Sequence, residues 1–89
     1  MARFEVNEVN LAAMGMQSAP GDVFFQLGMM YSTGRNVSTD LVEAHKWFNL
    51  AAAKGNREAA RYRQEVAGEM TAADVAAAQR EAREWLRTH

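Results

Sequence analysis

The 89-residue sequence contains no cysteine, so no disulfide bond can stabilise its fold. It contains one proline and no isoleucine, and no apolar run approaches the ~20 residues that a membrane-spanning helix needs. Its net charge is −1, because 10 lysines and arginines nearly balance 11 aspartates and glutamates. A general nucleic-acid-binding domain would carry a strong basic excess. These absences together predict one small soluble domain.

The region in which a secretory signal would need an apolar core contains the acidic residues Glu5 and Glu8. We therefore expect a cytoplasmic protein, and association with a membrane complex from the cytoplasmic side stays possible. The short length and the lack of disulfides also predict a marginal free energy of unfolding.

Alanine is the residue that this sequence has in abundance, with 17 of the 89 positions. Alanine is the best helix former because it loses no side-chain entropy on ordering. An alanine-rich core is thin, so helices must approach closely around a few large side chains, which here are Phe24, Tyr31, Trp47, Phe48, Tyr62 and Trp85. The composition predicts an all-α domain.

Apolar spacings of three and four predict four helices after residue 20. They are expected at Asp22–Thr33, Asp40–Lys54, Arg57–Gly68 and Ala72–Arg87. Residues 1–19 show no single apolar period and are interpreted as an N-terminal arm that could dock a partner. The chain is thus predicted to be an arm, 1–19, followed by one domain, 20–89.

Helix-capping residues stand at the expected boundaries. Asp40 precedes a helix with Glu43 three residues later, which is the capping-box spacing, and Asn56 and Thr71 precede the third and fourth helices. Gly34 and Gly55 follow the first and second helices, where a left-handed residue is common.

One segment, at about residues 23–59, combines small, aromatic and turn residues in a fixed order. These residues are Leu27, Gly28, Tyr31, Gly34, Val37, Asp40, Ala44, Trp47, Ala51, Ala52 and Gly55. The segment resembles the Sel-one-like repeat, an α-solenoid unit related to the tetratricopeptide repeat. Asn36 stands where that family usually has a second loop glycine, and asparagine also tolerates a positive φ.

The motif residues make physical sense as the contact surface of a helical hairpin. Gly28 lets the two helices touch, and the small residues Ala44, Ala51 and Ala52 do the same from the opposite helix. Tyr31 and Trp47 are predicted to fill the space between neighbouring repeats, and Val37 to anchor the loop.

No second complete repeat follows. A shift of 35 residues places Arg63 on the Gly28 position, and arginine cannot replace a close-contact glycine. Residues 57–87 are therefore interpreted as a capping helix pair, which gives a short solenoid of antiparallel helical hairpins. A solenoid repeat exposes apolar faces that its neighbours cover. The first helix forms the N-terminal face of this predicted solenoid, and no other segment of the chain is an obvious partner for that face.

Extra apolar residues on the first helix suggest a docking surface for another chain. Phe25, Met29 and Met30 lie outside the inner stripe assigned to Leu27 and Tyr31. The predicted partner-binding residues are these three with the arm residues Phe4, Val6, Val9 and Leu11. The alternative is that residues 1–19 fold back and cover the surface.

Catalytic and metal-binding patterns are missing. The sequence has no glycine-rich phosphate loop and no nucleophile elbow. Its two histidines, His45 and His89, lack further ligands at metal-site spacings, so both are expected on the surface. The arginines alternate with glutamates, and the pairs Arg61–Glu65 and Arg80–Glu84 favour a solvated, salt-bridged face over a nucleic-acid site.

The resemblance implies a non-catalytic protein–protein interaction module. We expect an accessory or assembly subunit of a larger bacterial complex, or a homodimer, with no metal, cofactor or small-molecule substrate. Two alternatives belong to other classes. One is a hydrolase of the repeat family, whose enzymatic relatives are cysteine-rich, and the other is a nucleic-acid-linked regulator that uses the arginine clusters.

Overall fold

A computed structural model describes residues 20–89 of the chain. These residues form four helices and no strand, namely α2 (Pro20–Thr33), α3 (Leu41–Ala53), α4 (Ala59–Ala67) and α5 (Ala72–Thr88). The predicted all-α fold is therefore confirmed. α2 begins at the only proline, which suits the first turn of a helix because its missing N–H would have no intrahelical partner there.

Side chains cap the helices at the predicted positions. The N–H of Glu43 donates to the Asp40 carboxylate over 3.1 Å, and the N–H of Asp74 donates to the Thr71 hydroxyl over 3.1 Å. The side-chain oxygen of Asn56 accepts from the N–H of Ala59 at 3.0 Å. α4 starts at Ala59 and not at residue 57. The side-chain oxygen of Asn56 also accepts from the N–H of Glu58 over 3.0 Å, and residues 57 and 58 form a bend that leads into the helix.

Positive φ angles occur where the sequence predicts them. Gly34 has a φ of 75° and Gly55 a φ of 103°. Asn36 has a φ of 68°, so asparagine does adopt the left-handed conformation at the position where the repeat family usually has glycine.

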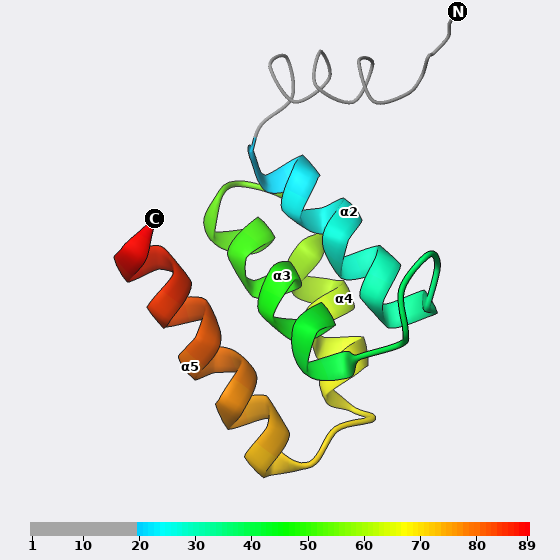
Figure 1. Cartoon of the computed structure of the whole chain (residues 1–89). Coiled ribbons are helices and arrows are strands. Elements are labelled where there is room, and N and C mark those ends of the chain that lie inside the picture. The colour runs from blue at the N-terminus through cyan, green and yellow to red at the C-terminus, as the bar shows by residue number, and fades with distance from the viewer. Residues whose placement is uncertain (1–19) are drawn as a thin grey trace, which may run out of the picture.

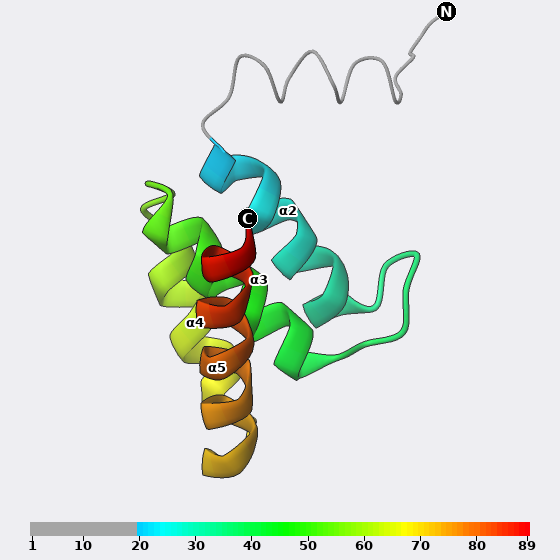
Figure 2. The same cartoon turned by 60° about the vertical axis from the view of Figure 1, so that its left-hand side comes forward.

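The helix α3 occupies the centre of the fold, and α2, α4 and α5 are arranged around it (Figures 1 and 2). Each of the three outer helices packs against α3. α4 and α5 make hardly any contact with each other, so the expected capping pair is not a packed hairpin. The two helices instead cover different sides of the hairpin that α2 and α3 form.

Two glycines allow α2 to lie directly on α3. A Cβ on Gly28 would come within 2.5 Å of the Phe48 ring, and a Cβ on Gly21 would come within 2.8 Å of the Ala51 carbonyl oxygen. Real Cβ atoms do not approach other atoms so closely, and overpacking of this kind usually costs about 1–3 kcal/mol. The close contact of α2 with α3 therefore depends on both glycines.

Six aromatic rings form two separate clusters. The α4-side cluster contains Phe25, Phe48 and Tyr62, with ring centroids 5.2–5.7 Å apart. The α5-side cluster contains Phe24, Trp47 and Trp85, with ring centroids 5.1–5.8 Å apart. Each cluster takes one ring from α2, one from α3 and one from the covering helix.

Candidate protein interface

The side chains of α2 are distributed differently from the sequence prediction. Phe25 packs against Phe48 and Tyr62, and Met29 packs against the buried core. Both residues were expected on an outward docking surface, and this placement is wrong. The inner stripe is centred on Gly21 and Gly28, which brings its flanking residues, Phe25 among them, onto the core.

One side of the α2–α3 hairpin is covered by another helix of the same chain. Trp85 of α5 contacts Phe24 of α2 and Trp47 of α3. The covering element is thus the last helix of the chain. The predicted arm residues Phe4, Val6, Val9 and Leu11 lie outside the described residues.

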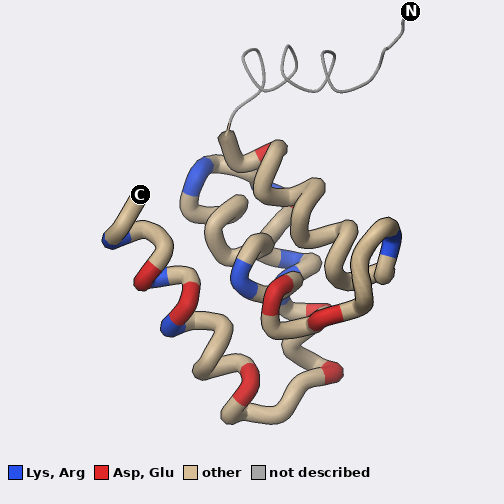
Figure 3. Tube along the Cα trace, viewed as in Figure 1, with Lys and Arg blue, Asp and Glu red and all other residues tan. Residues whose placement is uncertain are grey.

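A narrower apolar strip remains on the outer side of α2. Val23 is 43% exposed, and Leu27 and Met30 are half-buried. Positions i, i+4 and i+7 share one side of a helix, and this side is turned away from the buried Gly28. Figure 3 shows α2 almost without charge, since Asp22 is its only charged residue. An uncharged apolar strip of this kind suits contact with another protein.

Most residues of the predicted repeat motif lie at the contact of α2 with α3 or in the loop between them, whereas Leu27 lies on the outer side of α2 and Gly55 follows α3. Gly28, Ala44 and Ala51 are buried; Leu27, Tyr31, Gly34, Val37, Trp47 and Ala52 are half-buried; and Asp40 and Gly55 are exposed. The backbone carbonyl of Tyr31 accepts a hydrogen bond from the N–H of Asp40 over 3.0 Å. This bond ties the end of α2 to the start of α3.

Glu43 has a role that the capping-box spacing does not indicate. Its carboxylate accepts a hydrogen bond from the Trp47 indole N–H over 3.0 Å and pairs with Lys46 at 3.1 Å. Because the N–H of Asp40 already donates to Tyr31, Glu43 has no need to complete a reciprocal box. The glutamate instead fixes the ring of Trp47, which belongs to the α5-side cluster.

The prediction that His45 lies on the surface is wrong. This side chain is only 2% exposed, and its Nδ1 atom has no hydrogen-bond partner. Burial lowers the pKa of His45 below its usual 6.5, and the nearby positive charge of Arg63 lowers the pKa further. The sequence signal was available, because Val42 and Leu50 are apolar although they lie on other sides of α3 than Ala44 and Ala51. A helix with apolar residues on more than one side packs against more than one neighbour.

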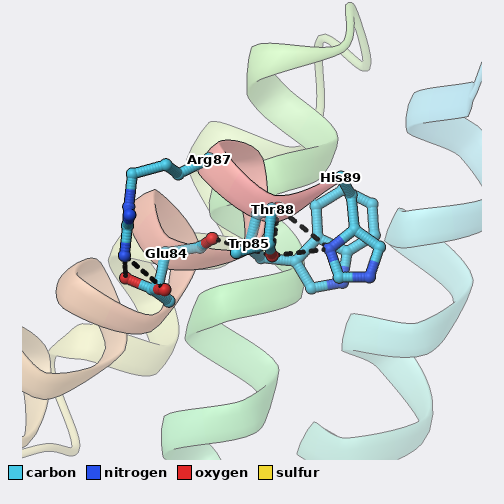
Figure 4. A network of polar contacts seen from close by, with 5 residues as sticks. All are labelled: Glu84, Trp85, Arg87, Thr88 and His89. Atoms are coloured by element: carbon cyan, nitrogen blue, oxygen red, sulfur yellow. Dashed lines mark hydrogen bonds and ion pairs between the residues drawn. The ribbon is translucent and has the colours of Figure 1, made fainter.

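The arginines form short-range pairs along α4 and α5. Arg61 pairs with Glu65 at 3.5 Å, as predicted. Glu84 pairs with Arg87 and not with the predicted Arg80 (Figure 4). In the same view the ring of His89 stacks on Trp85, with centroids 4.3 Å apart.

Residues 20–89 meet the requirements of neither a metal site nor a membrane-spanning helix. No group of three or more His, Cys, Asp or Glu side chains in this part could hold a metal ion. No described helix combines the length and the apolar character that a membrane crossing requires.

The geometry described above, two antiparallel helices in contact through glycine and alanine with a tight loop between them, defines an α-helical repeat hairpin. The family model of the Sel1 repeat matches residues 25–56. Residues 25–56 thus form a Sel1-like repeat, as the sequence resemblance predicted. Repeats of this family are typically protein-interaction modules. A search of curated proteins and a search of solved structures gave no match.

Proposed function

We propose that this protein is a small, non-catalytic accessory or assembly subunit of a larger bacterial complex in the cytoplasm. The observation that carries the proposal is the Sel1 repeat at residues 25–56, because repeats of this kind mediate protein contacts. The outer side of α2 offers an apolar, nearly uncharged strip that a partner could cover.

The proposed contact surface is narrower than the sequence suggested. Of the three predicted α2 residues, only Met30 lies on the outer side with Val23 and Leu27, since Phe25 and Met29 pack inward. The arm residues Phe4, Val6, Val9 and Leu11 remain part of the proposed surface, because the arm directly precedes α2 in the sequence.

The test is affinity capture with the tagged full chain, followed by mass spectrometry. Met30→Glu places a charge on the strip and should abolish capture of the partner while the helical circular dichroism stays unchanged. Gln79→Glu adds the same charge at an exposed position of α5 and should leave capture intact. Capture that survives Met30→Glu, or that is lost equally in both variants, would contradict the proposed surface.

A further inference from the structure

The connection between α4 and α5 is close to helical along most of its length. Gly68 has a φ of −63° and a ψ of −18°, which are right-handed helical values. The N–H groups of Glu69 and Met70 donate to the carbonyls of Val66 and Ala67, at 2.9 and 3.1 Å. These are the i to i−3 bonds of a 3₁₀ turn.

The direction of the chain changes at Thr71. This residue has a φ of −76° and a ψ of 159°, so its backbone is extended, and its hydroxyl caps α5 by accepting from the N–H of Asp74. A rotation about ψ of Thr71 towards the helical value would place α4 and α5 in nearly one continuous helix. Thr71 therefore has the position and the geometry of a hinge.

The contacts of α5 do not depend on α4 of the same chain. α5 packs against α3, and Trp85 reaches Phe24 and Trp47, whereas α4 and α5 hardly touch. A second copy of the chain offers the same α2–α3 surface. If α5 moved to that copy, it would recover its aromatic contacts and its α3 contacts without loss of a contact to α4.

We propose that two copies of this chain form a dimer by exchange of α5, with Thr71 as the hinge. In the dimer, α5 of each copy covers the α2–α3 hairpin of the other, and α4 continues into α5. Short hinge segments between elements with re-formable contacts are a known route to such exchange. This inference concerns the covered side of the hairpin and does not rest on the proposed function.

The hinge residue Thr71 sets the balance between the two forms. Thr71 stabilises the bent form because its hydroxyl caps α5, and this cap is lost in the continuous helix of both copies. Gly68 has helical dihedral angles already in the bent form, so Gly68→Ala strengthens the turn before the hinge without favouring either form. The double variant Gly68→Ala with Thr71→Ala should therefore raise the dimerisation constant by about tenfold or more. Thr71→Ser keeps the capping hydroxyl and should leave this constant at the wild-type value.

Size-exclusion chromatography with light scattering measures the dimer fraction of the full chain over a concentration series. Insertion of three glycines after Gly68 should lower that fraction, because a long flexible hinge lets α5 fold back on its own copy. The proposal would be overturned if the double variant and the insertion variant both had the dimer fraction of the wild type. It would also be overturned if the chain stayed monomeric in every case. If the double variant failed to fold, the comparison of wild type with the glycine insertion would decide in the same way.

Discussion

The two aromatic clusters differ in how completely the protein covers them. In the α4-side cluster Phe48 is fully buried, and the core residues Ala44 and Val66 lie against it. In the α5-side cluster all three rings are half-buried, and the Trp85 ring carries His89 on one face. The core is thus more completely buried on the α4 side than on the α5 side.

The two clusters show how helices of the same chain cover both sides of the hairpin. Phe24 and Phe25 are adjacent in sequence and diverge by about 100° around the helix axis, so they flank Gly28 and reach opposite sides of the hairpin. Trp47 and Phe48 diverge in the same way on α3. In a solenoid these two sides would be covered by the following and the preceding repeats. Here α4 covers one of them and α5 covers the other.

The largest expected effect comes from removal of the buried ring. Phe48→Ala should lower the free energy of unfolding by about 3–5 kcal/mol, because it leaves a cavity at the contact of α2, α3 and α4. A domain of marginal stability then unfolds as a whole. Trp85→Ala should cost roughly half as much, because this ring is half-buried.

Urea denaturation measures both variants, and amide hydrogen exchange locates the damage. In Trp85→Ala the fast-exchanging amides should be confined to α5, whereas in Phe48→Ala all four described helices should lose protection. Equal loss of protection along the chain in both variants would show that the two sides of the hairpin are not independent.

A smaller loss of folding stability is expected at acidic pH, and it should arise on the α4 side of the core. His45 is buried with a lowered pKa, so the folded state holds it neutral while the unfolded state takes up a proton below about pH 6.5. Because the unfolded state then binds more protons, stability is fully present above this pH and falls as the pH decreases towards the folded-state pKa. The slope should reach at most about 1.4 kcal/mol per pH unit.

Unfolding free energies measured between pH 8 and pH 5 (roughly the range in which a histidine titrates) test this expectation. His45→Leu should remove most of the slope, and His89→Gln should retain it, since His89 is exposed. The account of His45 would be contradicted by an unchanged slope in His45→Leu.

Much of the hairpin could be predicted from the sequence, because its signals are local. The caps Asp40 and Thr71, the left-handed Gly34 and Asn36, and the close-contact Gly28 each depend on residues within a few positions or on one partner helix. Each of these residues favours one backbone conformation or permits one close contact. The helices therefore occur close to where the apolar spacing predicts them.

The positions of the covering helices could not be predicted in the same way. Helical spacing states which side of α5 is apolar, and it does not state which of several apolar surfaces that side meets. The wrong predictions for Phe25 and His45 have the same origin, because each prediction assumed that a helix has only one buried side. α3 is surrounded by three helices, so buried residues such as His45, Phe48 and Leu50 point in different directions.

The central claim is that α5 covers the α2–α3 hairpin on the side that α4 leaves open. Nuclear Overhauser effects between aromatic ring protons in the monomeric fraction test it most directly. The structure predicts effects from Trp85 to both Phe24 and Trp47, whose ring centroids lie 5.1 and 5.8 Å away, and none to Tyr62. A Trp85 ring that shows effects to Tyr62, or to neither Phe24 nor Trp47, would contradict the account.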